Sequence, residues 1–330
     1  MVTSTSIIIP TYNRAEDLRA CLDSILVQTV MPEEIIIVDD SEDDNTFRLV
    51  EERKKEFEEK GVVLKYIKNH HERSSAIARN LGIEAAQGGI IFFLDDDVIL
   101  MNDYLEHVLE VYQNYPDCVG VQGYVILKNG FGRFDNIVSK IIFHNYIETD
   151  SAHVLPSVNV TYPYPLNEIS KCEWLAGCNQ SYRAEVLREF RFDENFKRYS
   201  WREDVDLSYR IYKRYKGLYI TPHARLIHNL SPRARTPNRA LIYMIEVHQL
   251  YLFFKLIDQT PKNLFIYLWN KIGFFLAVLG LLIFKPWKST RTKLLRLKYL
   301  IGAYFLCLTH IKEIRRGDLG FMDQLLQTKV

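Results

Sequence analysis

Three consecutive aspartates, Asp95, Asp96 and Asp97, end an apolar run in the segment IIFFLDDDVIL (residues 90–100). Like charges beside a buried strand cost free energy through repulsion and desolvation. Mg²⁺ or Mn²⁺ would cancel that repulsion, because such ions bind one or two carboxylates together with phosphate oxygens. In an extended chain Asp95 and Asp97 point to one side and Asp96 to the other. The segment predicts a metal–diphosphate site, with a solvated turn and helix cap as the alternative.

A second acidic group begins a predicted helix, WREDVDLSYRIYKRYKG (residues 201–217). Its first turns hold Glu203, Asp204 and Asp206, where a carboxylate can act as a general base or stabilise the positive end of the helix dipole. A short strand is expected at residues 217–221, followed by His223 and His228. A lone histidine is more often structural than a metal ligand. His223 and His228 therefore become candidate ligands only in combination with the aspartates.

The elements that must position these side chains alternate between strand and helix. Strands are expected at residues 6–9, 34–38, 62–67 and 90–94, and helices at 16–28, 45–60 and 74–87. This alternation predicts an α/β fold with a mostly parallel central sheet covered by helices on both faces. Ligands bind outside the carboxyl ends of such strands. The polar segments found there are PTYNR (10–14), DDSEDDN (39–45), NHHERSS (69–75) and DDD (95–97).

Composition and missing motifs exclude several classes of protein. The 330-residue chain has a net charge of +1, which gives no general attraction to nucleic acid. The chain contains neither GxGxxG after the first strand nor GxxxxGK[ST], so a cation rather than a glycine-rich loop is expected to hold phosphates. The five cysteines form no metal or disulfide pattern, and the start MVTSTSIIIP lacks the features of a secretory signal. A cytosolic catalytic part is therefore expected.

Taken together, these segments resemble the family 2 glycosyltransferases of GT-A fold. The resemblance covers about residues 4–232, in the order of the family, through SIIIPTYNR, IIIVDDSEDDN, SSAIARNLGIEAAQGGIIFFLDDD, WLAGCNQSYRAEVLREFRFDENF and REDVDLSYRIYKRYKGLYITPHARLIHN. It implies a catalytic domain at residues 1–235, with a nucleotide-sugar half (1–125) and an acceptor half (126–235). The segment NHHERSS departs from the Asn-x-Gly common in the family, so the contacts of that loop are not carried over.

The resemblance implies an inverting transfer from a nucleotide diphosphosugar, expected to be a UDP-sugar, to a glycan or lipid-linked acceptor. Asp95, Asp97 and His228 would hold Mg²⁺ or Mn²⁺, and Asp204 would be the general base, with Glu203 as the second choice. Asp39 would read the edge of the base and Arg79 would meet the diphosphate. The full set expected at the nucleotide is Pro10, Thr11, Tyr12, Arg14, Asp39, Arg79, Asp95 and Asp96.

Two tryptophans, Trp174 and Trp201, offer flat apolar faces for an acceptor sugar, with plain packing as the alternative. Two other functions compete with sugar transfer. One is a metal-dependent nucleotidyltransferase or pyrophosphatase-like enzyme, which would not need Asp204. The other is a catalytically silent scaffold that binds a sugar nucleotide or glycan.

The last third of the chain, residues 236–330, is a helical region with apolar segments at 241–257, 264–284 and 294–308. The middle segment barely reaches the about 20 residues that a spanning helix needs. A single crossing would also place the basic linker 285–298 opposite a cytosolic catalytic domain, against the positive-inside tendency. We therefore expect helices lying on the cytoplasmic face of a membrane, in contact through residues 241–310. One or two true spans, or a soluble homo-oligomer interface, are the alternatives.

Overall fold

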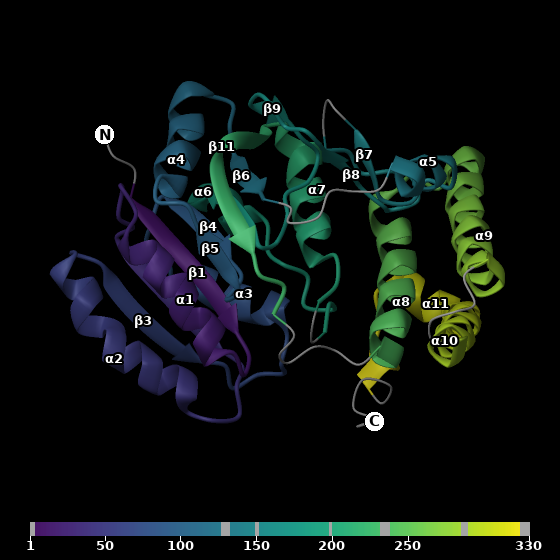
Figure 1. The fold of residues 1–330 in the computed structure, drawn as a ribbon, viewed down its shortest axis with the longest axis horizontal. Coiled ribbons are helices and arrows are strands. Elements are labelled where there is room, and N and C mark those ends of the chain that lie inside the picture. Colours follow the sequence, from purple (N-terminus) through teal and green to yellow (C-terminus); the bar gives the residue numbers. More distant parts are fainter. Residues whose placement is uncertain are drawn as a thin grey trace. The chain divides into compact units, whose positions relative to one another are not determined.

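A computed structural model describes residues 4–126, 133–148, 152–197, 200–231, 238–284 and 290–323. The chain divides into two compact units (Figure 1). The first comprises Met1–Gly130, Thr149–Ala152 and Pro163–Ala234; the second comprises Phe131–Glu148, His153–Tyr162 and Arg235–Val330. Two segments that the sequence assigned to the acceptor half, residues 131–148 and 153–162, therefore group with the C-terminal helices. The expected domain boundary at residue 235, and Lys285 and Lys288 of the basic linker, lie outside the described residues.

The first unit begins with four parallel strands in the order β3-β2-β1-β4. They are β1 (Thr5–Thr11), β2 (Glu34–Asp39), β3 (Val63–Lys68) and β4 (Ile90–Leu94), separated along the chain by helices α1 (Ala15–Leu26), α2 (Asn45–Glu59) and α3 (Ser75–Ala85). Consecutive isoleucines of β1 and β2 are fully buried, as expected of strands covered on both faces. The predicted elements are confirmed, with ends that differ by no more than two residues.

The other half of the sheet is mixed, which the sequence did not predict. Strand β10 (Asn179–Arg183) runs antiparallel between β4 and β6 (Gly120–Val125), and β11 (Leu218–His228) is parallel to β6 but antiparallel to β5 (Val98–Leu100) and β9 (Ser170–Lys171). In Figure 1 this part of the sheet runs from blue β4 to green β11. Helices α4 (Tyr104–Asn114), α6 (Ala184–Glu189) and α7 (Glu203–Tyr215) complete the unit.

Strand β10 escaped prediction because its sequence, NQSYR, is polar although it is buried. Asn179 and Ser181 are at most 1% exposed. The Asn179 amide donates to the carbonyl of Gly123 at 2.9 Å, and the Ser181 hydroxyl donates to that of Val121 at 2.8 Å. Polar side chains therefore find partners on the neighbouring strand β6, as buried polar groups must.

The second unit is mainly helical. It contains α5 (Arg133–Ile141), the strand pair β7 (Tyr146–Glu148) and β8 (Thr161–Pro163), α8 (Asn238–Leu256), α9 (Pro261–Phe284), α10 (Thr290–Thr309) and α11 (Ile311–Arg316). Buried polar contacts join α9 to its neighbours: Lys271 Nζ lies 2.5 Å from Glu246 Oε2 of α8, and the Asn270 amide donates to the carbonyl of Ile142 at 2.9 Å. By length and composition, residues Pro261–Gly280 of α9 qualify as a candidate membrane span.

Candidate active site

The three aspartates form the turn between β4 and β5, and strand β11 carries His228 to the same place. Its antiparallel register sets His228 opposite Val98, the residue after Asp97. His228 Nε2 lies 3.0 Å from Asp97 Oδ1 and 3.9 Å from Asp95 Oδ2. One ligand atom from each of the three residues lies within 4.8 Å of the other two. Residues 131 positions apart in the sequence thus form one cluster because β5 and β11 are paired.

The donor set and spacing of this cluster fit Mg²⁺ or Mn²⁺. Cis ligands at about 2.1 Å from an octahedral ion lie about 3 Å apart, close to the 3.0 Å and 3.9 Å separations observed. Carboxylate oxygens suit both ions, whereas an imidazole nitrogen is more typical of a transition metal such as Mn²⁺ than of Mg²⁺. Asp95, Asp97 and His228 are therefore the described residues that fit a metal ion.

The protein holds Asp97 and His228 as an ionised pair. Burial on its own raises the pKa of Asp97, but His228, the backbone N–H of Ser231 at 2.8 Å and Arg14 together lower it. Burial likewise lowers the pKa of His228, yet the contacts with Asp97 and Cys178 raise it to about 11. The pairing with Asp97 therefore favours a protonated imidazole in the absence of metal, and a metal ion that binds His228 would displace this proton.

Asp96 lies outside this cluster and joins the aspartate turn to the end of β1. It is 4% exposed and accepts hydrogen bonds from the Thr11 hydroxyl at 2.8 Å and Arg14 Nη1 at 3.1 Å. Burial raises its pKa to about 7, although Arg14 and Thr11 oppose that shift. Thr11 and Arg14 were both expected at the nucleotide, and their side chains donate hydrogen bonds to the aspartate turn.

The remaining predicted nucleotide residues lie at the ends of β1 and β2. Asp39 is fully buried, where it accepts hydrogen bonds from the Ser41 N–H at 2.9 Å and the Tyr66 hydroxyl at 2.8 Å. Pro10 pairs with a residue of β2 within the sheet. Tyr12 is half-buried, and the guanidinium of Arg73 stacks on its ring at 4.1 Å. Arg73 was not among the residues predicted at the nucleotide, although it lies in the polar segment NHHERSS.

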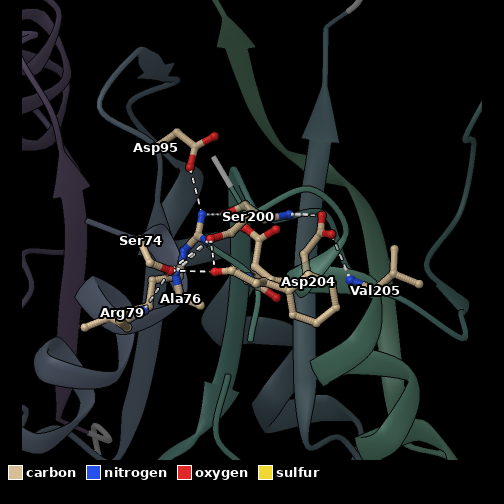
Figure 2. A network of polar contacts seen from close by, with 12 residues as sticks. Ser74, Ala76, Arg79, Asp95, Ser200, Asp204 and Val205 are labelled. Carbon is tan, nitrogen blue, oxygen red and sulfur yellow. Dashed lines mark hydrogen bonds and ion pairs between the residues drawn. The ribbon is translucent and has the colours of Figure 1, made fainter. Parts of the chain in front are cut away.

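Arg79 lies on α3, the helix before β4, and is enclosed by protein groups. Its side chain is 3% exposed, and its guanidinium lies between two carboxylates (Figure 2). Nη1 donates to Glu203 Oε1 at 2.5 Å, and Nη2 donates to Asp95 Oδ1 at 3.0 Å and to the carbonyl of Gly177 at 3.4 Å. Protein groups therefore bind both ends of the guanidinium that was expected to meet the diphosphate. Arg79 connects the metal-binding turn to the start of α7.

The two candidate bases differ in their surroundings. Glu203 is 7% exposed, and burial raises its pKa despite the opposing effect of Arg79. Asp204 is partly exposed, and backbone N–H groups orient both of its oxygens: Gly177 donates to Oδ2 and Val205 to Oδ1, each at 2.8 Å (Figure 2). The geometry favours Asp204, because its carboxylate is both oriented and accessible.

Gly177 permits this close approach of the acceptor-side segment. A Cβ atom at this position would lie 3.3 Å from Asp204 Cβ and 3.4 Å from Arg79 Nη2. Hydrogen bonds also connect the segment before α7 to the start of α3. The hydroxyl of Ser74, the residue before α3, lies 3.1 Å from that of Ser200, and both hydroxyls donate to the carbonyl of Phe196 (Figure 2). The start of α7 is therefore fixed to the nucleotide half of the unit.

Neither tryptophan is freely exposed. Trp174 is 2% exposed, so its ring packs in the interior, which is the alternative that the sequence left open. Trp201 is partly exposed, and the guanidinium of Arg202 lies over its ring at 4.9 Å. Of the two, Trp201 alone keeps part of its surface for a ligand.

Comparison with known proteins shows what this sequence and geometry are similar to. Residues 6–165, just under half of the chain, match the model of glycosyl transferase family 2. Over this length the chain is similar to the family 2 glycosyltransferases, and its first unit has the GT-A fold. A mannosyltransferase from Pyrobaculum calidifontis, solved with GDP-mannose and Mn²⁺, superposes with a TM-score of 0.57 at 18% identity, over 93% of this chain and 87% of that one. At that identity the likeness concerns the fold.

Two curated relatives share part of the sequence. Glycosyltransferase GlyA of Streptococcus pneumoniae is 29% identical over 188 residues, which are 57% of this chain and 25% of the relative. Glucosyl-dolichyl phosphate glucuronosyltransferase of Haloferax volcanii is 31% identical over 123 residues, 37% of this chain and 38% of the relative. The matches thus span between a quarter and two fifths of the length of these relatives.

Proposed function

We propose that this protein is a metal-dependent, inverting glycosyltransferase that moves a sugar from a nucleotide diphosphosugar to a glycan or lipid-linked acceptor. The observation that carries the proposal is the arrangement of Asp95, Asp97 and His228 with Asp204. A metal-binding cluster and an oriented carboxylate lie on the two sides of one arginine, Arg79. Sugar transfer needs both, because the leaving diphosphate must be neutralised while the acceptor hydroxyl loses its proton.

The chain's own residues perform distinct tasks in this reaction. Asp95, Asp97 and His228 would hold Mn²⁺ or Mg²⁺, which supplies charge neutralisation for the diphosphate when bound. Asp204 accepts the proton of the acceptor hydroxyl, and its hydrogen bonds from Gly177 and Val205 fix its direction. The acceptor oxygen then bonds to the anomeric carbon, and the electron pair of the broken bond leaves with the nucleoside diphosphate. A single displacement of this kind inverts the anomeric carbon.

A UDP-sugar is the first donor to test, since a carboxylate at the end of β2 can accept a hydrogen bond from the ring N–H of uracil. Asp39 already accepts from Tyr66 and Ser41, so base recognition would require a rearrangement of those contacts. A lipid-linked acceptor at the cytoplasmic face of a membrane is supported by the apolar helix α9 and by the dolichyl-phosphate enzyme among the relatives.

Donor screening with and without metal tests the proposal. Nucleoside diphosphates and nucleotide sugars should raise the melting temperature of the full chain in the presence of Mn²⁺, because a ligand that binds the native state stabilises it. The matching sugar nucleotide should then release nucleoside diphosphate, and NMR of the product should show an inverted anomeric centre. Release of pyrophosphate or nucleoside monophosphate, or retention of configuration, would contradict the proposal.

An Asp204→Asn variant separates catalysis from binding. Loss of a general base should lower the transfer rate by roughly 10²–10⁴-fold. Donor affinity should stay close to that of the wild type, because Asp204 lies on the acceptor side of Arg79. Wild-type transfer by this variant would remove Asp204 from the mechanism, whereas lost donor affinity would point to misfolding of the segment around Gly177.

A further inference from the structure

Exposed large apolar side chains concentrate in the second unit. Of the 19 that are exposed among the described residues, 14 belong to this unit. Most of them lie on two helices: Leu264, Phe265, Leu268, Trp269, Ile272 and Leu276 on α9, and Leu294, Leu295, Ile301, Phe305 and Leu308 on α10. We call these eleven side chains the apolar face. Clustered apolar exposure of this kind marks an interaction surface.

Each helix exposes its apolar residues on one side. At about 100° per residue, the six side chains of α9 fall within an arc of about 140°, and those of α10 span a similar arc. The opposite side of α9 is turned toward the protein, where Asn270 is 2% exposed, and Lys271, at the edge of the apolar arc, lies 2.5 Å from Glu246. The two helices adjoin, since the Tyr304 hydroxyl of α10 donates to the carbonyl of Lys271 at 3.1 Å.

The charge of this region is strongly one-sided. The sequence has no acidic residue between Asp258 and Glu313, whereas nine lysines and arginines lie in that interval. The rest of the chain has 33 lysines and arginines, that is 42 less these nine, against all 41 acids. Exposed Arg291, Arg296 and Lys298 stand beside the apolar residues of α10. The net charge of +1 therefore conceals a basic surface next to an apolar one.

A surface that combines apolar and basic side chains fits an anionic bilayer as its partner. Apolar side chains that enter the headgroup–acyl boundary, with lysine and arginine at the anionic headgroups, are the pattern of helices that lie in the plane of a membrane. We propose that α9 and α10 dock this protein on an anionic membrane surface through the apolar face, with α9 lying in the interface and not crossing the bilayer. The proposal concerns a surface, and it does not depend on the catalytic activity.

A crossing α9 would bring unfavourable groups into the hydrocarbon. Lys271 is the eleventh of its 24 residues, so it would lie near the bilayer centre. The adjoining α10 would follow, because Tyr304 contacts Lys271, and its exposed Arg296 and Lys298, eight and six residues before Tyr304, would be drawn into the hydrocarbon as well. In the interface the same two side chains reach the headgroups, and Lys271 keeps its partner Glu246.

Vesicle flotation of the purified full chain tests this docking without donor or acceptor, so its outcome is independent of the proposed transfer reaction. The chain should float with vesicles of equal phosphatidylglycerol and phosphatidylcholine, and only weakly with phosphatidylcholine alone. Raising NaCl from about 0.1 to 0.5 M should weaken binding on the order of 10-fold. Equal binding to both vesicles, or none to either, would overturn the proposal, as would a salt-independent dimer that binds no vesicle.

A matched pair of double variants tests the surface itself. Phe265→Glu with Phe305→Glu, at positions 65% and 68% exposed, should lower vesicle affinity on the order of 100-fold. Val27→Glu with Val63→Glu adds the same charge at positions 64% and 54% exposed in the first unit. If the apolar face is the docking surface, the vesicle affinity of this control should stay within about 3-fold of the wild-type affinity. An equal loss of vesicle affinity in both double variants would show that only the net charge matters, and it would overturn the assignment of the apolar face as the docking surface.

Two measurements distinguish lying in the interface from crossing. Alkaline carbonate should release the bound chain from vesicles, and retention after that wash would indicate a spanning helix and overturn the in-plane arrangement. Trp269, 41% exposed on the apolar face, should be quenched more by lipids brominated near the headgroup than by lipids brominated near the chain ends. The measurement is made in a Trp287→Phe background, because Trp287 lies between the two docking helices in the sequence. The difference should disappear when Trp269→Phe is added, and preferential quenching from the chain ends would contradict the proposal.

Discussion

Replacing Arg79 by methionine should damage both stability and the site, because this arginine is the sole basic partner that the structure describes for buried Glu203. The Arg79 and Glu203 side chains are 3% and 9% exposed, and their charged atoms lie 2.5 Å apart. Methionine keeps much of the side-chain volume but removes the charge and all three hydrogen bonds of the guanidinium. Glu203 is then left buried without its cation.

The expected magnitude follows from that burial. Removing one partner of a buried ion pair costs about 3–5 kcal/mol, because the other charge stays desolvated. At about 2–4 °C per kcal/mol for a domain of roughly 200 residues, the melting temperature should fall by about 6–20 °C. An exposed pair gives the contrast: Arg48 and Asp44 are 71% and 61% exposed, so Arg48→Met should cost less than about 1 kcal/mol.

Denaturant unfolding of four chains measures this effect: wild type, Arg79→Met, Glu203→Gln and the double variant. The double variant should be more stable than Arg79→Met, because a neutral amide removes the unpaired charge. The donor screen with Mn²⁺ should also show weaker metal-dependent binding in Arg79→Met, since Asp95 loses the group that holds it. A cost below about 1 kcal/mol for Arg79→Met, or additive effects in the double variant, would refute the reasoning.

The remaining predictions concern the metal and the acceptor segment. Asp97→Ala should abolish Mn²⁺-dependent binding of nucleoside diphosphate in calorimetry, while Asp103→Ala, which removes a half-buried acid just before α4, should leave it intact; unchanged affinity in Asp97→Ala would exclude it as a ligand. Gly177→Ala should lower the transfer rate about 10-fold through displacement of Asp204, with less than about 2 kcal/mol of stability lost, since the added Cβ meets neighbours at 3.3–3.4 Å; an unchanged rate would show that the segment adapts.

Local patterns in the sequence were sufficient for the first half of the sheet and for the metal cluster. Strands β1 to β4 were predicted from their apolar runs. The sequence also suggested Asp95 and Asp97 as metal ligands, and the structure places these two aspartates together with His228, although they lie in a turn rather than in an extended strand. Strand β10 could not be predicted in this way, because the partners that make NQSYR tolerable inside the protein lie on β6, more than 50 residues away. Side-chain periodicity carries no information about such pairing.

The position of Arg79 was unpredictable for a related reason. It was expected to meet the diphosphate, but the contacts with Asp95 and Glu203 could not be foreseen, because both carboxylates come from other elements and Glu203 is 124 residues distant. Ser231, whose N–H holds Asp97, and Arg73, which stacks on Tyr12, were missed because their contacts also join distant segments. The grouping of residues 131–148 with the C-terminal helices likewise depends on long-range contacts.

Gly177 connects the donor and acceptor sides of the proposed transfer site. Its N–H holds the oxygen of Asp204 that faces the acceptor segment, and its carbonyl accepts from Arg79, which also holds Asp95. An acceptor that orders this segment should therefore tighten donor binding, and reciprocity requires the donor to tighten acceptor binding by the same factor. Calorimetric titration of the donor with and without acceptor would reveal this cooperativity, and equal affinities would show that the two halves of the site bind their ligands independently.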